Sequence, residues 1–416
     1  MSWDEVTFEA IFAAPTRNGI YKGKEFQGAG VPIVNMGELF AYNRINDQDM
    51  TLIQMTDAEM EKSGLMDGDL LFGRRSIVEE GAGKCSIVYK PSVAMTFESS
   101  IIRVRLNKAI ADPEFYFNYF RSPIGRGRIR AIVNGATVKG IRGSDLKVIK
   151  VHQPPLREQI AIREVVAAYD DLIATNQCRI NLLEEGARRL YREWFVNLRF
   201  PGHETVKMVD GVPEGWERVI YADIVHVNPR TPFEKDQEHP FVDMAALSES
   251  SMVIGPRSSR VISGGAKFRN GDTLLARITP CIENGKTGFV QFLDDDLAVA
   301  SGSTEFIVLR SQKVNPWWVY CSAREEHFRE YAIRSMSGSD GRQRVNTDCF
   351  AKLGALLPPQ SALDQFGALV SDSFTQIERL TEQNRLLAKA RDALLPKLMS
   401  GKLDVSGIAL PELDAA

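Results

Sequence analysis

The feature that most constrains this chain is that its second half repeats its first. Short segments recur in the same order and at a nearly constant offset. The matches pair Trp3–Phe8 with Trp216–Tyr221, Pro32–Met36 with Pro240–Met244, Gly68–Arg74 with Gly271–Arg277, Gly83-Lys84 with Gly285-Lys286, and Pro154-Pro155 with Pro358-Pro359. One match can arise by chance, but an ordered series indicates a tandem duplication of one structural unit.

Each repeat combines a β-rich part with a long helical part. In the β-rich parts, short apolar runs such as 101–106 and 306–309 alternate with glycine-rich turns, which is typical of strands. An aromatic stretch behind a proline predicts a helix in each copy, at 112–120 and 316–322. The fold class predicted is therefore α+β, with two β-rich α/β domains in tandem separated by two long helices. The predicted segments are 1–152 and 201–357 for the domains (the second with a short linker, 201–212), 153–200 and 358–403 for the helices, and 404–416 for a C-terminal tail.

Both long segments carry apolar residues at alternating spacings of four and three, the pattern of a coiled-coil seam. Each segment of about 40 residues would span on the order of 60 Å. Equivalent elements of a duplicated chain that pack together are related by a pseudo-two-fold axis, so we expect an antiparallel coiled coil that holds the β-rich domains apart. The predicted seam residues are Tyr169, Leu172, Asn176, Leu183, Leu190, Ile377, Leu380, Asn384, Leu387 and Leu394.

Polar and helix-breaking residues modify this pattern. Asn176 and Asn384 either fix the register of the seam or are tolerated polar positions within it. Ser361 and Asp364 predict a capping box at the start of the second helix. Pro396 predicts a kink or an end near Leu395, and Gly401 predicts a stop.

The motifs of catalysis and nucleotide binding are incomplete. Gly81–Lys84 and Asn284–Thr287 resemble phosphate-binding loops, but the first glycine of that motif is replaced by Val78 and Pro280, and strand-like residues follow where the motif needs a helix. Hairpin turns are the better interpretation. No Ser/His/Asp arrangement, acidic pair or nuclease-like cluster is discernible, and the five cysteines stand singly. We therefore predict no catalytic residue, no metal site and no disulfide, and a nucleotide-hydrolysing enzyme rests only on the two incomplete loops.

Charge limits the kind of nucleic-acid binding that is possible. The formal net charge is −3 and the isoelectric point is near 6.1, so any DNA contact must come from local basic patches. The N-terminus lacks a basic and then apolar signal, and no stretch of eighteen apolar residues occurs. We expect a cytoplasmic protein without membrane contact.

The local basic patches follow the repeated Gly-Asp element and, in the first copy, a stretch that has no acidic residue before Asp145. Arginine binds phosphate and reads guanine edges in two-point contacts, whereas the alternative interpretation is a solvated basic face. The candidate DNA-binding residues are Arg74, Arg75, Arg126, Arg128, Arg130, Lys139 and Arg142 in the first copy and Arg277, Arg342 and Arg344 in the second. Acidic residues are interspersed in the second stretch, so the patch is diluted there.

Four segments in order resemble a known family. They are Pro155–Gln159 and Leu190–Phe195 at the two ends of the first helix, Val212–Glu217 at the start of the second copy, and Leu394–Gly401 near the end of the chain. Together they are similar to the specificity subunit of type I restriction-modification systems. This resemblance implies two target recognition domains, each reading one half of a split duplex DNA site.

The resemblance also implies partners. In that family the helices dock methyltransferase subunits, expected to be two here, and a motor-nuclease restriction subunit joins for cleavage. The specificity chain itself is not an enzyme and holds no cofactor; S-adenosylmethionine, ATP and Mg²⁺ are expected only on partner subunits. The alternative function is a helical scaffold that carries two protein-binding modules and has no role with DNA.

Overall fold

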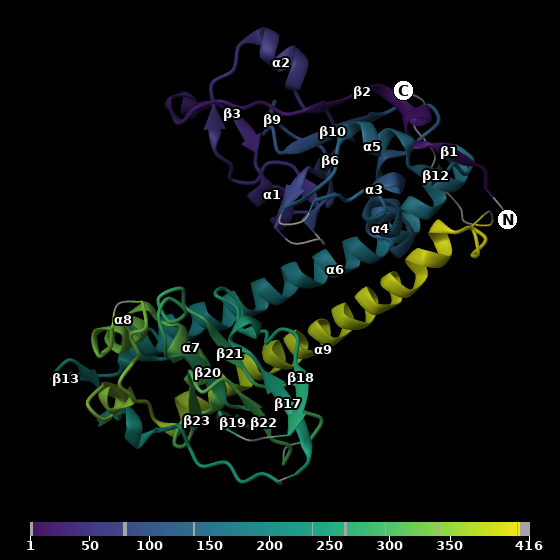
Figure 1. The fold of residues 1–416 in the computed structure, drawn as a ribbon. Helices are drawn as coiled ribbons and strands as arrows, with labels where there is room; N and C mark the ends of the chain where they lie inside the picture. Colours follow the sequence, from purple (N-terminus) through teal and green to yellow (C-terminus); the bar gives the residue numbers. More distant parts are fainter. Residues whose placement is uncertain are drawn as a thin grey trace. The chain divides into compact units, whose positions relative to one another are not determined.

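A computed structural model of the chain describes residues 3–77, 81–135, 138–234, 236–261, 264–295, 297–339, 341–405 and 407. The chain divides into two compact units, Met1–Leu172 with Leu387–Ala416, and Ile173–Leu386. Each unit, taken by itself, contains one β-rich domain and a part of each long helix (Figure 1). Most of the predicted tail, 404–416, lies outside the described residues.

The first unit is built on a five-stranded sheet of order β2-β10-β6-β8-β4, in which only the β8–β4 pair is parallel. A second sheet has the order β5-β3-β9, and a ribbon joins β1 to β12. Its elements are β1 (Glu5–Thr7), η1 (Phe8–Ile11), β2 (Phe12–Asn18), η2 (Lys24–Phe26), β3 (Gln27–Val34), α1 (Met36–Ala41), β4 (Arg44–Ile45), β5 (Leu52–Ile53), α2 (Asp57–Ser63), β6 (Leu70–Gly73), β7 (Arg75–Ser76), β8 (Cys85–Val88), β9 (Thr96–Phe97), β10 (Ile101–Leu106), α3 (Pro113–Arg121), α4 (Pro123–Arg130), β11 (Lys139–Gly140), α5 (Gly143–Val148) and β12 (Lys150–His152).

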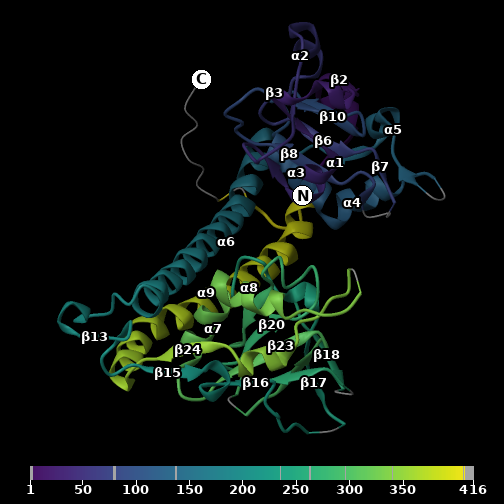
Figure 2. The same cartoon turned by 90° about the vertical axis from the view of Figure 1, so that its left-hand side faces the viewer.

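The second unit has the same plan (Figure 2). One antiparallel sheet has the order β16-β23-β20-β21, another sheet has the order β18-β17-β22-β19, and a ribbon joins β15 to β24. Its elements are η5 (His203–Thr205), β13 (Met208–Val209), β14 (Val212–Pro213), β15 (Glu217–Ile220), η6 (Tyr221–Asp223), β16 (Val225–Val227), β17 (Glu238–Val242), η7 (Met244–Ala246), β18 (Ser258–Val261), β19 (Ala266–Phe268), β20 (Thr273–Ala276), β21 (Thr287–Phe289), β22 (Ala300–Gly302), β23 (Phe306–Ser311), α7 (Pro316–Arg324), α8 (Glu326–Arg334), η8 (Thr347–Ala351) and β24 (Gly354–Leu357).

The strand orders confirm the duplication. The series β2-β10-β6-β8 corresponds to β16-β23-β20-β21, β5-β3-β9 corresponds to β18-β17-β22, and the β1–β12 ribbon corresponds to β15–β24. The predicted helices behind prolines are α3 and α7, and in each the preceding residue, Asp112 or Asn315, caps the helix through its side chain. The tandem α+β architecture predicted from the repeats is therefore correct.

The repeated Gly-Asp element holds the main sheet of each unit together. Asp69 accepts two hydrogen bonds from Arg105 on β10, both at 2.7 Å, and a third at 2.8 Å from the backbone N–H of Met66. In the second unit Asp272 accepts bonds of 2.7 and 2.6 Å from Arg310 on β23. Both carboxylates are almost completely buried. Folding removes the charge of each aspartate carboxylate from water, so the carboxylate needs a two-point ion pair with an arginine. Both copies of the domain therefore carry the same aspartate and arginine pair.

The long helices are α6 (Leu156–Tyr191), which continues into a π-helical turn at Arg192–Val196, and α9 (Gln360–Met399). In the second unit the two helices run antiparallel, because Asn176 faces Asn384 whereas Tyr191, later in α6, contacts Phe366, earlier in α9. The amide of Asn176 donates to Asn384 at 3.0 Å, and the amide of Asn384 donates to the carbonyl of Ile173 at 3.2 Å. This polar layer is buried on the α6 side.

The helices also complete the cores of the domains. Ile180, Ala187 and Tyr191 of α6 belong to the core of the second unit. Leu395 and Leu398 of α9 belong to the core of the first unit. The boundaries predicted at 152/153 and 357/358 separate helix from domain in sequence, but the compact units cut through both helices instead. The reason is that apolar side chains near the helix ends have no other surface on which they are buried.

The predicted seam residues differ in burial. Asn176, Ile377 and Leu380 are buried, and Leu183, Leu190 and Leu394 pack partly buried against the domain cores. Tyr169, Asn384 and Leu387 are half-buried. Leu172 is 49% exposed, so this prediction is corrected: its neighbour Ile173 is half-buried instead.

Two predictions about helix ends are also corrected. Helix α9 begins at Gln360, so Ser361 lies inside it and is not an N-cap; the side chain of Gln360 instead donates to Asp364 at 2.8 Å. Helix α9 continues past Pro396 to Met399, so the end predicted near Leu395 does not occur there; the predicted kink stays a prediction, since proline removes one backbone hydrogen bond of the helix. Gly401 has the positive φ of 66° that ends a helix, as predicted.

Replacing Asp272 with Ala should lower the free energy of unfolding of the second unit by about 3–5 kcal/mol, because Arg310 remains buried without its partner. Trp194, Trp216, Trp317 and Trp318 lie in this unit, so tryptophan fluorescence during urea denaturation of the full chain monitors its unfolding. The control is Asp372→Ala, at an exposed position of α9. A loss below about 0.5 kcal/mol, the range of ordinary surface substitutions, would contradict the role assigned to this pair.

Candidate nucleic-acid interface

In the first unit a short ribbon brings predicted basic residues together. Strand β7 pairs with β11, so that Arg75 lies opposite Gly140 and Ser76 opposite Lys139. Arg74 is anchored just before this ribbon: its N–H donates to the carbonyl of Ser100 at 2.8 Å, and its carbonyl accepts from Ile141 at 3.0 Å. Backbone pairing therefore gathers Arg74, Arg75 and Lys139, which are far apart in sequence, at one edge of the sheet.

Side-chain exposure differs among these residues. Arg75 is exposed, and among the described residues no acidic side chain forms a salt bridge with it. Arg130 and Arg142 are exposed as well, and Arg74 and Lys139 are half-buried. The exposed guanidinium groups at this edge are available for an anionic partner such as DNA phosphate.

Arg126 and Arg128 have partners within the protein. The guanidinium of Arg126 donates to the carbonyl of Gly83 at 3.0 Å, which fixes helix α4 on the turn before β8. Arg128 forms an ion pair with Glu5 of β1. It also lies beside Tyr119, whose pKa is raised mainly by burial and lowered in part by the Arg128 charge. Successive helical residues point in different directions, so one basic stretch of sequence is divided between two surfaces.

The second unit repeats the geometry around the arginine that follows the Gly-Asp strand. The N–H of Arg277 donates to the carbonyl of Glu305 at 3.0 Å, and its carbonyl accepts from Val345 at 2.8 Å. These bonds match those that Arg74 makes with Ser100 and Ile141. A bridge between Ile278 and Arg344 takes the place of the β7–β11 ribbon. The two copies thus present one arginine each at the same point of the fold.

The other two arginines predicted in the second unit, Arg342 and Arg344, differ in their contacts. Arg344 makes a two-point contact with the carboxylate of Glu305, at distances of 2.8–3.0 Å. This hydrogen bond and the carboxylate charge raise the pKa of Arg344. Arg342 is exposed. Arg344 is thus neutralised by Glu305, which lies outside the stretch of interspersed acids, so this pair does not test the dilution predicted from those acids.

The glycine-lysine loops are hairpin turns, as predicted. They lie between antiparallel strands, β6 and β8 in one copy and β20 and β21 in the other. Gly83 and Gly285 have positive φ values of 67° and 79°. A side chain at either position would collide with a neighbour, Ile129 or Arg329. The glycines are therefore required by the turn, and a strand rather than a phosphate-binding helix follows each of them.

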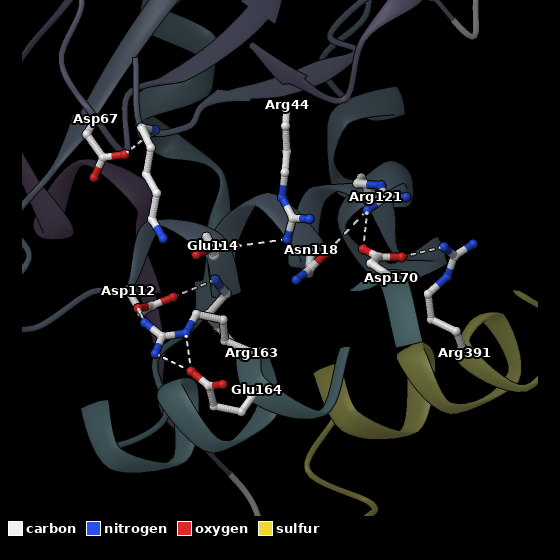
Figure 3. Close-up of polar contacts among 12 residues, drawn as sticks. Arg44, Asp67, Asp112, Glu114, Asn118, Arg121, Arg163, Glu164, Asp170 and Arg391 are labelled. Atoms are coloured by element: carbon white, nitrogen blue, oxygen red, sulfur yellow. Dashed lines mark hydrogen bonds and ion pairs between the residues drawn. The ribbon is translucent and has the colours of Figure 1, made fainter. Parts of the chain in front are cut away.

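A polar cluster in the first unit joins helix α3 to the long helices (Figure 3). Asp170 of α6 lies 2.6 Å from the guanidinium of Arg391 on α9 and 3.8 Å from that of Arg121 on α3. Burial lowers the pKa of Arg121, and the Asp170 charge opposes this effect. Arg163 of α6 pairs with Asp112 at 2.8 Å in the same region. These charges are satisfied within the protein, so the cluster attaches the helices to the domain and is not a free binding site.

One pocket of the second unit adds residues that sequence reasoning missed. Arg230 and Lys267 line the same cavity as Arg277. Arg230 lies in the proline-flanked loop Pro229–Pro232 after β16, and Lys267 lies in β19; neither segment carried a periodic or repeated pattern that would have marked it as a site. Within the described ranges, no group of His, Cys, Asp or Glu is arranged to hold a metal ion. The helices of that part of the chain include none with the length and apolarity that a membrane span requires.

The repeated domain with a basic edge defines a protein built from two copies of one recognition module. Residues 2–185 match the family model described as type I restriction modification DNA specificity domain. The chain is 25% identical over 369 residues to the type I restriction enzyme MjaIX specificity subunit of Methanocaldococcus jannaschii, covering 80% of this chain and 83% of that protein. It is 32% identical over 174 residues to the EcoKI specificity subunit of Escherichia coli K12, covering 41% of this chain and 37% of that protein.

A solved structure agrees in fold. The S subunit of a type I restriction-modification system from M. genitalium superposes with a TM-score of 0.56 at 14% identity and covers 96% of both chains. The resemblance drawn from the four sequence segments is thus confirmed: this chain is similar to the specificity subunits of type I restriction-modification systems.

Replacing Gly285 with Ala should lower the free energy of unfolding by more than about 1 kcal/mol, because alanine is strained at positive φ and its methyl group meets Arg329. The matched control is Gly186→Ala in α6, where nothing lies within 4 Å of the added methyl group; this change should raise stability by about 1 kcal/mol. Urea denaturation of both variants tests the assignment. Equal effects at the two positions would argue against a conformational requirement at the turn.

Proposed function

We propose that this chain is the DNA sequence-specificity subunit of a type I restriction-modification complex and that each unit reads one half of a split duplex site. The observation that carries the proposal is the equivalence of Arg74 and Arg277. Each follows a buried Gly-Asp strand and is held by the same pair of backbone hydrogen bonds. A duplicated recognition surface is what a two-part target requires, and the family match supports DNA as the ligand.

We further propose that α6 and α9 form an antiparallel coiled coil that acts as the spacer between the two half-sites and docks the methyltransferase subunits. The contacts of Asn176 with Asn384 and Gln383 support pairing in a fixed register, because a buried amide needs hydrogen-bonding partners opposite it on the facing helix. The exposed apolar side chains of Leu182 and Leu369 on these helices offer contact area to partner subunits.

The chemistry of the complex would lie on the partners. S-adenosylmethionine would be held by the methyltransferase subunits, and ATP and Mg²⁺ by a motor-nuclease restriction subunit. The alternative of a scaffold without a DNA role accounts for the helices, but it gives no reason for basic residues at the same point of both domains. The comparisons with known proteins do not favour it.

Coexpression of the chain with its neighbouring methyltransferase should produce adenine methylation at a split motif, with two unrelated halves separated by a fixed number of unspecified base pairs. Sequencing that detects modified bases across genomic DNA measures this directly. Cells that express the methyltransferase without this chain are the control and should lack the motif. A single uninterrupted motif, or methylation that does not depend on this chain, would contradict the proposal.

The complex with methyltransferase should bind its site far more tightly than the chain alone, because a chain of net charge −3 neutralises few phosphates. In that complex, Arg75→Ala should weaken binding and reduce the slope of log K against log salt by up to about one unit. The matched control is Arg128→Ala in the same unit, which removes an ion pair with Glu5 and should leave the slope unchanged. Equal slopes for both variants would remove Arg75 from the interface.

A further inference from the structure

The second unit contains a pocket of about 700 Å³ beside Arg277. Three cationic side chains line it: Arg230 from the loop behind β16, Lys267 from β19, and Arg277 from the end of β20. Among the residues that the structure describes, no aspartate or glutamate lines it. The other described residues that line it are neutral, and they include Phe233, Gly265 and Thr304.

The charges in this pocket are not neutralised by the surrounding protein. Nε of Arg277 is buried and has no hydrogen-bond partner among the described residues. The carboxylate of Glu305, which follows the lining residue Thr304, is already engaged by Arg344 in a two-point contact. Arg230 is exposed and forms no salt bridge with a described residue. A buried N–H group without a hydrogen-bond acceptor costs free energy, and so does positive charge without a counter-ion. An anion bound beside Arg277, Arg230 and Lys267 would offset both costs.

Two contacts within the protein position the ammonium group of Lys267 beside the pocket. Its ammonium lies 4.9 Å from the ring centre of Phe233 and 3.3 Å from the carbonyl oxygen of Gly265. Neither the Phe233 ring nor the Gly265 carbonyl neutralises the positive charge of Lys267. Two prolines and Phe233 supply apolar surface beside the cations, which suits the sugar that accompanies a backbone phosphate.

We propose that this pocket binds a backbone phosphate of duplex DNA and anchors the half-site that the second unit reads. The proposal rests on the proposed function and adds Arg230 and Lys267, with Arg277, as the residues that position the DNA. Because a phosphate carries no sequence information, the pocket fixes the orientation of the duplex and leaves discrimination between bases to other residues.

The test uses the complex of the full chain with its methyltransferase and a duplex that carries the methylated motif. Arg230→Ala and Lys267→Gln should each weaken binding about tenfold at physiological salt and reduce the salt slope by about one unit. The preference for the cognate site over a scrambled site should not change. Lys352→Ala, at an exposed position outside the pocket, makes the same change in net charge and should have little effect.

Neutral phosphate analogues locate the contact. Methylphosphonate substituted at single positions of the second half-site should weaken binding by the wild-type complex at one phosphate, and the same substitution should cost the Arg230→Ala complex no further affinity. Unchanged affinity and slope in both variants would overturn the pocket assignment, and so would a loss confined to one base pair, which indicates base reading. Failure of the wild-type complex to distinguish its motif from scrambled DNA would instead refute the proposed function, and the pocket assignment with it.

Discussion

The buried ion pair between the Gly-Asp aspartate and an arginine on the neighbouring strand is the interaction on which each recognition domain depends. It joins β6 to β10 in the first unit and β20 to β23 in the second. A carboxylate this deeply buried is stable only with a full set of donors, so its partner strand is tightly specified. The arginine that follows the strand therefore occupies the same position in both copies.

Whether a basic side chain of this protein is neutralised depends on the acidic side chains next to it in the folded structure. Arg128 and Arg344 resemble Arg75 and Arg277 in sequence, yet the first two are paired with Glu5 and Glu305. The net charge of −3 is a sum over the whole chain and does not say which basic side chains are paired. At the β7–β11 edge and in the Arg277 pocket, Arg75 and Arg230 are exposed without a salt bridge to a described residue, so an anionic ligand would gain from binding there.

Much of the architecture followed from the sequence because a duplication supplies two independent views of one fold. Strands such as 101–106 and the helices behind Pro113 and Pro316 were predicted in both copies. The sequence predicted less accurately which residues of α6 face the seam. Leu172 was placed in the seam, but a shift of one residue moves a side chain by about 100° around a helix, and Leu172 is exposed whereas its neighbour Ile173 is half-buried.

The sequence by itself determined the repeat, the α+β class, the hairpin character of the glycine-lysine turns and the family resemblance. Those properties depend on local propensity and on residue order. Only the tertiary structure decided which arginines are neutralised, that Arg230 and Lys267 line one pocket with Arg277, and that residues of the long helices belong to the domain cores. Pairing between side chains distant in sequence depends on the folded path of the chain, and no spacing along the sequence encodes it.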